Sequence, residues 1–333
     1  MPAEFAPAWL KAIQFVEEFG ENPSVHGSIS EIGTAWEKIL SRLATQYNIP
    51  PPDDSVQTED VTLDNFWLRV YKPQSSTESS NTPNHQKKTV GVYIHGGGWA
   101  LGSVDQEDAI TRLISKTFNM TLVSVSYRLA PEHKYPSALD DCLEAVDWVL
   151  KNLNATSILL TGPSAGGNLS FGTALKLIDQ GRGDIVKGVV ALVPVTIHPD
   201  LVSAEITAAG LYDSYDINAD ATVNSKSAMS AFFNAYNAPS DDVYTSCLLH
   251  PKLKELKKVY IAECGADTLR DDARLMKDAL EKARVPVVYR AYPGFPHYSW
   301  TYPSSLLDEH RREFLGDMLD GIKWVLGDNG SLS

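Results

Sequence analysis

Two glycine-rich stretches of this chain carry the residue types that acyl transfer needs, a nucleophile and backbone donors for an oxyanion. They are His95-Gly96-Gly97-Gly98-Trp99 and Gly162-Pro163-Ser164-Ala165-Gly166. Each follows a short apolar run rich in β-branched residues, 89–94 and 157–161. In a G-x-S-x-G pattern the serine lies on a tight turn between a strand and a helix, which exposes its Oγ. The two stretches, in this order, indicate nucleophilic chemistry at Ser164.

A nucleophilic serine of this kind needs a histidine base and a carboxylate, and both are expected later in the chain. The apolar run 258–264 predicts a strand, and Asp267 lies in the loop after it. The next predicted strand, 287–292, is followed by a loop that ends at His297. Order and topology therefore predict a triad of Ser164, Asp267 and His297.

Other acidic and imidazole side chains offer alternatives to these assignments. Asp271 and Asp272 are rival acids, but they begin a predicted helix, where carboxylates interact well with the helix dipole. His95 is expected to hold the glycine loop in shape, and His133 to serve packing.

The elements that must position these residues alternate between strands and helices. Strands are expected at 89–94, 121–127, 157–161, 186–195, 258–264 and 287–292, and helices at 137–153, 165–179, 271–283 and 307–326. A hairpin is expected over 55–63 and 66–71, and an exposed polar loop over 75–88. This alternation predicts an α/β fold with a mostly parallel central sheet covered by helices on both faces.

Two segments do not show the alternation of predicted strands and helices. Residues 1–54 show helical spacing of apolar residues and end in a proline-rich linker, and 197–240 is rich in alanine, serine and aromatic residues. We interpret both as a small helical cap. The predicted organisation is therefore an N-terminal cap segment (1–54), a first part of the core (55–196), a cap insertion (197–240) and a second part of the core (241–333).

Composition limits the classes of partner and compartment. The chain has 333 residues, 43% of them hydrophobic, and a net charge of −13, which disfavours nucleic acid and anionic membrane surfaces. Cys142, Cys247 and Cys264 lack metal-ligand spacing and fit reduced thiols in a cytoplasmic protein. Residues 1–20 lack the pattern of a signal peptide, and no stretch has the length of a membrane span. No metal and no organic cofactor is expected.

Three segments carry a resemblance to a known family. They are the 95–99 stretch, the segment Tyr127-Arg128-Leu129-Ala130-Pro131-Glu132-His133-Lys134-Tyr135-Pro136 with the acids that follow it, and the serine turn extended to Leu169. On these segments the chain resembles the hormone-sensitive-lipase-like carboxylesterases of the α/β-hydrolase fold. The resemblance implies an oxyanion hole of the Gly97, Gly98 and Ala165 N–H groups. It also implies that Glu132 and Asp140 brace loops around the site.

The expected activity is hydrolysis of a small ester, with a short acyl group or an apolar or aromatic character, through an acyl-enzyme on Ser164. Trp99, Phe232 and Phe233 are candidate substrate contacts. An acyltransferase, a lyase or an amidase on the same triad remains an alternative, as does a non-catalytic small-molecule receptor. Pro163 departs from the family, which most often has an acidic residue there. Related enzymes often pair through the last strand and helix, which makes a homodimer an expectation.

Overall fold

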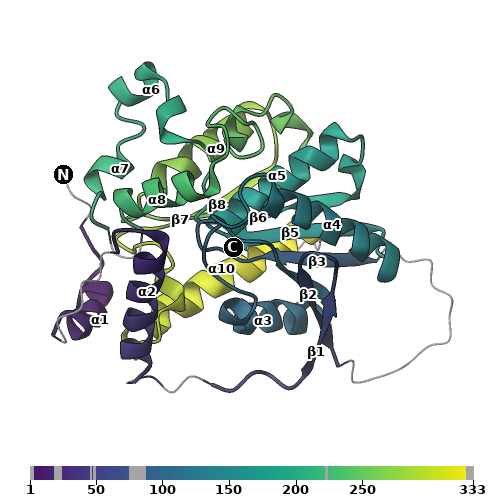
Figure 1. The fold of residues 1–333 in the computed structure, drawn as a ribbon, viewed down its shortest axis with the longest axis horizontal. Helices are drawn as coiled ribbons and strands as arrows, with labels where there is room; N and C mark the ends of the chain where they lie inside the picture. The colour runs from purple at the N-terminus through teal and green to yellow at the C-terminus, as the bar shows by residue number, and fades with distance from the viewer. Residues whose placement is uncertain are drawn as a thin grey trace.

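An eight-stranded sheet forms the centre of the protein in a computed structural model that describes residues 4–18, 25–45, 47, 50–74, 88–221 and 224–327 (Figure 1). The strand order is β1-β2-β4-β3-β5-β6-β7-β8. The strands are β1 (Val56–Thr62), β2 (Trp67–Pro73), β3 (Thr89–Ile94), β4 (Leu122–Ser126), β5 (Ser157–Pro163), β6 (Val186–Leu192), β7 (Val259–Cys264) and β8 (Val287–Tyr292). β1 pairs antiparallel with β2, and β2 with β4; the remaining pairs are parallel. The predicted mostly parallel sheet is confirmed.

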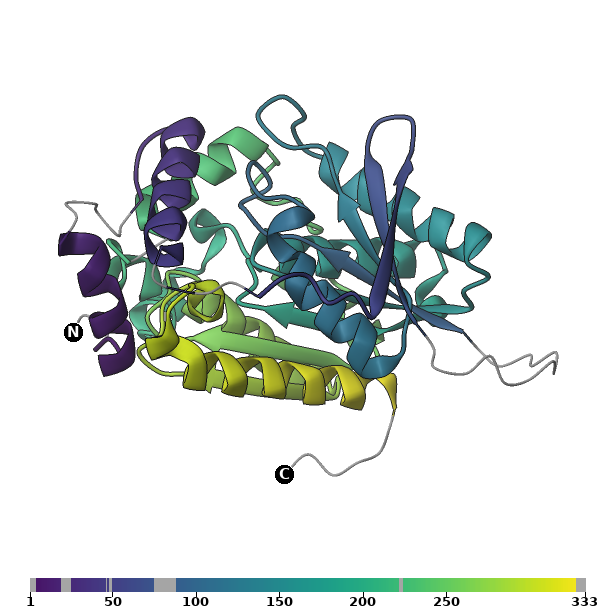
Figure 2. The same cartoon turned by 90° about the horizontal axis from the view of Figure 1, so that it is seen from below.

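Helices cover both faces of this sheet. They are α1 (Pro7–Glu18), α2 (Ile29–Ala44), α3 (Asp108–Phe118), α4 (Ser137–Asn152), α5 (Ala165–Asp179), α6 (Ala204–Ala208), α7 (Ser214–Ile217), α8 (Lys226–Tyr236), α9 (Arg270–Lys282) and α10 (Asp308–Leu326). Figures 1 and 2 show α3 and α10 on one face and α4, α5 and α9 on the other. None of the helices that the structure describes is long and apolar enough to cross a membrane.

The buried strands explain why helices cover both faces of the sheet, because the side chains of each strand alternate between the two faces. Val92 and Leu160 belong to the apolar cluster under α4, α5 and α9, whereas Tyr93 and Leu159 belong to the cluster under α3 and α10. A strand buried on both faces reads as a continuous apolar run. This is why the strand positions were predictable from the sequence.

The largest difference between a predicted and an observed strand boundary is at the end of β6. The strand expected over 186–195 ends at Leu192, because Val193 adopts a positive φ of 43° and the chain leaves the sheet there. The loop expected at 75–88 lies almost entirely outside the described residues.

The two segments that lack the alternation of strands and helices lie together at one end of the sheet (Figures 1 and 2). We call α1, α2 and residues 197–240 the cap. The N-terminal segment is tied to the start of α8 by hydrogen bonds. Ser225 Oγ donates to the Val25 carbonyl at 2.7 Å, and His26 Nδ1 lies 2.6 Å from Ser227 Oγ. Two segments that are 200 residues apart in the sequence thus form one layer over the carboxyl ends of the parallel strands.

Candidate active site

Ser164 lies on a sharp turn between β5 and α5. Its backbone has φ 53° and ψ −120°, a combination that costs free energy and is typical of functional turns. Gly162 and Gly166 flank Ser164. Both lie so close to the Ile94 carbonyl oxygen that neither position has room for a side chain. A Cβ on either glycine would lie 2.1 and 2.0 Å, respectively, from the Ile94 carbonyl oxygen. The glycines therefore let β3 and the serine turn pack against each other.

Ser164, His297 and Asp267 form a continuous hydrogen-bonded chain. His297 Nε2 lies 3.0 Å from Ser164 Oγ, and His297 Nδ1 lies 2.6 Å from Asp267 Oδ2. The serine follows β5, the aspartate follows β7 and the histidine follows β8. Because parallel strands present their carboxyl ends at one edge, three distant residues meet there. Ser164 is only 5% exposed and Asp267 is fully buried.

The second oxygen of Asp267 is held by several donors. Asp267 Oδ1 accepts from the Leu269 N–H at 3.0 Å and from Asn224 Nδ2 at 3.4 Å. Asn224 also donates to Thr268 Oγ1 at 2.7 Å. Asn224 belongs to the cap, so the cap itself helps to orient the acid. No sequence pattern indicated this residue, because its role depends on how the cap docks.

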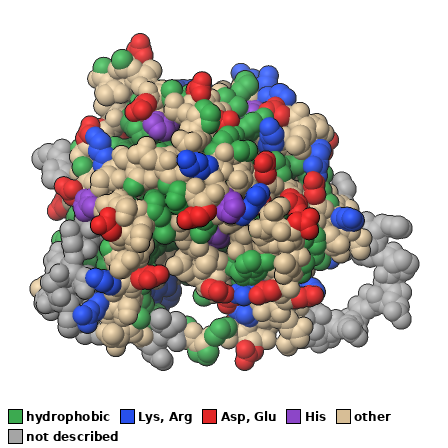
Figure 3. All heavy atoms as spheres, viewed as in Figure 1, with side chains coloured by type: hydrophobic (Ala, Val, Ile, Leu, Met, Phe, Trp, Pro, Cys, Tyr) green, Lys and Arg blue, Asp and Glu red, His purple; other side chains and the backbone are tan. Residues whose placement is uncertain are grey.

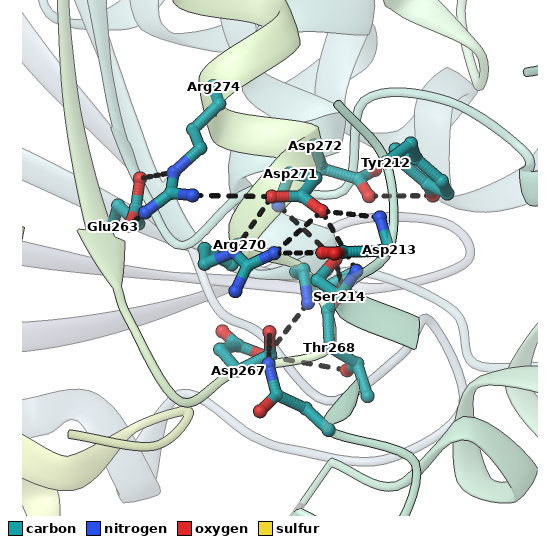
Figure 4. A network of polar contacts seen from close by, with 12 residues as sticks. Tyr212, Asp213, Ser214, Glu263, Asp267, Thr268, Arg270, Asp271, Asp272 and Arg274 are labelled. Atoms are coloured by element: carbon teal, nitrogen blue, oxygen red, sulfur yellow. Dashed lines mark hydrogen bonds and ion pairs between the residues drawn. The ribbon is translucent and has the colours of Figure 1, made fainter. Parts of the chain in front are cut away.

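The side chains of the rival acids Asp271 and Asp272 lie beside Tyr212, Asp213 and Ser214 of the cap (Figure 4). Asp271 Oδ2 accepts from the N–H groups of Asp213 and Ser214, both at 2.8 Å. Asp272 accepts from the Thr196 N–H at 2.8 Å and from the Tyr212 hydroxyl at 3.0 Å. Burial raises the pKa of Asp272 to about 7. These two carboxyl groups anchor the cap to α9.

The glycine loop after β3 places backbone donors beside Ser164. Gly97 and Gly98 line the same small cavity as Ser164 and His297, and Ala165 is the first residue of α5. No acceptor among the described residues takes a hydrogen bond from the Gly97 or Gly98 N–H. Donors of this kind are free to bind an oxyanion.

Glu107 connects this loop to the histidine loop, and the sequence reasoning missed it. Its carboxyl accepts from the Gly96 N–H at 3.1 Å, from the Tyr298 hydroxyl at 2.9 Å and from the Tyr93 hydroxyl. Burial raises the pKa of Glu107, and these three donors oppose that change. The Glu107 carboxyl group thus accepts hydrogen bonds both from Gly96 in the glycine loop and from Tyr298, which follows His297.

His95 has the structural role that was predicted for it. Its Nδ1 lies 2.7 Å from the Gly96 carbonyl oxygen, so Nδ1 carries the proton, since a carbonyl only accepts. The ring stacks on Tyr127 with centroids 4.2 Å apart. Burial lowers the pKa of His95 to about 4, which keeps the ring neutral near pH 7.

The assignment of Asp140 and Glu132 as braces needs correction, because both side chains are exposed. The neighbouring Asp141 is buried and accepts hydrogen bonds from Arg128. Arg128 Nη2 lies 2.6 Å from Asp141 Oδ1, and the Arg128 N–H donates to Oδ2 at 2.8 Å. Successive residues on a helix point about 100° apart, so the rotation of α4 selects which of the two acids faces inward.

The cavity beside Ser164, which we call the serine pocket, is small. Its volume is about 10 Å³, and its walls include Val195, Asn224, Met229 and Phe232. Of the predicted substrate contacts, only Phe232 lies here. Trp99 is fully buried and stacks on Tyr236 at 4.7 Å, and Phe233 lines a separate cleft in the cap. Phe232 is buried and its neighbour Phe233 is only partly buried, because successive residues of α8 point in different directions.

Comparisons with known proteins agree with this geometry. A family model described as alpha/beta hydrolase fold matches residues 91–301. The versiconal hemiacetal acetate esterase of Aspergillus parasiticus is 51% identical over 98% of this chain and 100% of its own. The enzyme of the same name from Emericella nidulans is 49% identical over 87% of this chain and 98% of its own.

Solved structures of other proteins have the same fold as this chain. An esterase from Pyrobaculum calidifontis superposes with a TM-score of 0.77 at 26% identity, covering 97% of this chain and 99% of the other. Vibralactone cyclase superposes with a TM-score of 0.82 at 24% identity, covering 99% and 97%. The triad order, the glycine loop and these relatives place this chain in the hormone-sensitive-lipase-like carboxylesterase family of the α/β-hydrolase fold, and it is a serine carboxylesterase.

Proposed function

We propose that Ser164 attacks the carbonyl carbon of a small ester while His297 accepts its proton. The supporting observation is the hydrogen-bonded chain from Ser164 Oγ through His297 to Asp267. Asp267 keeps the proton of the neutral imidazole on Nδ1, which leaves Nε2 free as the base. The alcohol then leaves with the proton from His297, and an activated water molecule releases the acyl group from Ser164.

The backbone N–H groups of Gly97, Gly98 and Ala165 are proposed to hold the oxyanion of the tetrahedral intermediate. The placement of both glycines in the serine pocket and of Ala165 at the start of α5 supports this proposal. A helix N-terminus stabilises negative charge through its free N–H groups. A single oxyanion donor typically contributes about 2.7–4 kcal/mol to transition-state stabilisation.

The acyl group that we propose is acetyl. A serine pocket of about 10 Å³ has room for roughly one water-sized group, which matches a methyl and excludes a long chain. The relatives at 51% and 49% identity carry names that specify an acetate ester of a hemiacetal. We therefore infer that this chain removes an acetyl group from a larger hydroxylated compound.

The test is a chain-length series of p-nitrophenyl esters from acetate to palmitate. We expect acetate to have the highest kcat/KM and palmitate no detectable turnover. Ser164→Ala is expected to lower kcat by about 10⁴–10⁶. A preference for palmitate, or full turnover by the Ser164→Ala protein, contradicts the proposal. Product analysis with and without an added alcohol separates hydrolysis from acyl transfer.

We also propose a small-molecule partner, a cytoplasmic location and a division into core and cap at residues 54, 196 and 240. On the face seen in Figure 3, acidic and basic side chains are interspersed, which does not favour a polyanion. Cys142, Cys247 and Cys264 are buried and free, as in a reducing compartment. The edge position of β8 supports pairing through the last strand and helix as a homodimer, which sedimentation would test.

A further inference from the structure

Side chains of the cap hold the loop that carries Asp267. Ser214 Oγ donates to the Thr268 carbonyl at 2.6 Å (Figure 4). Asn218 Nδ2 donates to the Asp267 carbonyl at 2.8 Å. Asn224 Nδ2 reaches two side chains of the loop, Thr268 Oγ1 at 2.7 Å and Asp267 Oδ1 at 3.4 Å. Three cap residues thus bind two successive residues of the acid loop.

Thr268 and Asn224 are joined by two hydrogen bonds of opposite direction. The Thr268 hydroxyl donates to the main-chain carbonyl oxygen of Asn224 at 2.9 Å, and the same hydroxyl oxygen accepts from Asn224 Nδ2 at 2.7 Å. One hydroxyl therefore contacts both the backbone and the side chain of Asn224. Thr268 is fully buried and Asn224 is almost so, which keeps water from competing for these groups.

The neighbours of the Asn224 amide determine which of its two ends faces Asp267. A carboxylate only accepts hydrogen bonds, and the single proton of the Thr268 hydroxyl goes to the main-chain carbonyl, the nearer of its two acceptors. Both groups therefore accept from the amide nitrogen, whose two protons match these two acceptors. With the amide reversed, its oxygen would face the Asp267 carboxylate and repel it.

The donors to Asp267 Oδ1 determine the direction of the other carboxylate oxygen. The Leu269 N–H at 3.0 Å and Asn224 Nδ2 hold Oδ1 in place. This arrangement leaves Oδ2 pointing at His297 Nδ1, 2.6 Å away. Leu269 belongs to the acid loop itself and donates whatever the position of the cap. Asn224 belongs to the cap, so its hydrogen bond exists only while the cap is docked.

Asn224 also faces the substrate. It lines the serine pocket with Met229 and Phe232, whereas Thr268 does not line that pocket. The distance of 3.4 Å between Asn224 Nδ2 and Asp267 Oδ1 is long for a hydrogen bond. Such bonds in a substrate-free site often shorten when the substrate binds. An acyl group that fills the serine pocket therefore restrains the same residue that holds the acid.

We propose that Asn224 and Thr268 are positioning residues for the reaction, through which the docked cap orients the Asp267 carboxylate. The Asn224 amide holds Asp267 Oδ1, and the Thr268 hydroxyl holds the amide. The inference rests on the proposed triad at Ser164 and deepens it, because it makes cap docking a condition for the full orientation of the acid. Without the Asn224 donor, the Asp267 carboxylate holds the imidazole of His297 less firmly.

Thr268→Val tests the pair without touching the serine pocket, because valine keeps the shape of threonine and removes the hydroxyl. We expect kcat for p-nitrophenyl acetate to fall about three- to tenfold, while KM changes less than about twofold. The ratio of acetate to butyrate turnover is expected to stay the same. Thr268→Ser retains the hydroxyl and is expected to have a kcat within about twofold of the wild type.

Proton NMR separates positioning from a general loss of structure. The proton between His297 Nδ1 and Asp267 Oδ2, in a short charge-assisted hydrogen bond, resonates far downfield of the amide protons. We expect this signal to shift or broaden in Thr268→Val and to be retained in Thr268→Ser. Thr245→Val is the matched control, because the Thr245 hydroxyl is buried and has no partner among the described residues. It is expected to change neither kcat nor the signal.

Asn224→Ala removes the amide directly and is expected to lower kcat at least as much as Thr268→Val. The double variant should lose no more than Asn224→Ala, since both changes act through one amide. The inference is overturned if either single variant retains full kcat, if Thr268→Ser is as slow as Thr268→Val, if the losses of the single variants multiply, or if Thr245→Val causes the same loss. Failure of the underlying function looks different, since Ser164→Ala would then keep full turnover.

Discussion

The link between Tyr298 and Glu107 leads to a quantitative prediction for Tyr298→Phe. Tyr298 follows His297 and adopts a positive φ of 59°, which is strained for a tyrosine. Its hydroxyl donates to Glu107 Oε1 at 2.9 Å, and the same oxygen accepts from the Gly96 N–H at 3.1 Å. Removing the hydroxyl leaves the ring in place and takes away one of three donors from a buried carboxyl group.

A hydrogen bond to a charged group contributes about 1.5–3 kcal/mol to stability, and we expect the free energy of unfolding to fall by that amount. We expect an effect on catalysis because Glu107 accepts a hydrogen bond from Gly96, which is next to the proposed oxyanion donors. Each ~1.4 kcal/mol lost from transition-state stabilisation lowers the rate tenfold. We expect kcat for p-nitrophenyl acetate to fall about tenfold, with a change in KM of less than about threefold.

Tyr302→Phe is the matched control. The Tyr302 hydroxyl is buried but meets no hydrogen-bond partner among the described residues. Its removal is expected to leave stability unchanged or slightly increased and kcat unaffected. Urea unfolding followed by tryptophan fluorescence and steady-state kinetics at pH 8 measure both quantities. Equal losses of stability in the two variants, or an unchanged kcat in Tyr298→Phe, would refute the argument.

Three further predictions use matched residues elsewhere in the fold. Gly166→Ala is expected to abolish folding or activity, since its Cβ would lie 2.0 Å from a neighbouring carbonyl oxygen, whereas Gly316→Ala meets nothing within 4 Å and should raise the melting temperature slightly. Asp141→Asn should cost about 1.5–3 kcal/mol in urea unfolding and Asp140→Asn less than about 0.5 kcal/mol, because only Asp141 is buried and paired with Arg128, whose side chain is 25% exposed. Burial lowers the pKa of His310 to about 4. The folded state therefore binds fewer protons than the unfolded state, and the wild-type protein loses stability as the pH falls from about 6.5 towards 4. In His310→Leu this loss should be smaller by up to about 1.4 kcal/mol per pH unit, and an unchanged slope in acid titrations of the melting temperature would contradict the assignment.

The core of the fold was predictable because its signals are local. The strand, tight turn and helix around Ser164 are encoded within about twenty residues by an apolar run, two glycines and a helical pattern. The predicted positions of Asp267 and His297 needed only chain order, because the ends of successive parallel strands lie at one edge of the sheet. The geometry brings both side chains to Ser164.

The contacts that depend on docking were not predictable in this way. Sequence patterns cannot distinguish Asp140 from Asp141, because the rotation of α4 against the sheet decides which acid is buried. They also missed Glu107 and Asn224, which reach the site only when the 95–107 loop and the cap have folded over it. Trp99 and Phe233, two of the predicted substrate contacts, lie outside the serine pocket: Trp99 stacks on Tyr236, and Phe233 lines a separate cleft of the cap.

The sequence by itself determined the chemistry that we propose for this protein, since the serine, the acid and the base of the proposed triad follow from residue type, spacing and chain order. The tertiary structure decided the shape of the space around that chemistry. The small pocket at Ser164, the larger cleft lined by Trp36 and the carboxyl group that joins the glycine loop to the histidine loop all arise where segments far apart in sequence pack together. Such contacts depend on how whole helices and strands are oriented against one another, and short-range sequence patterns do not encode that orientation.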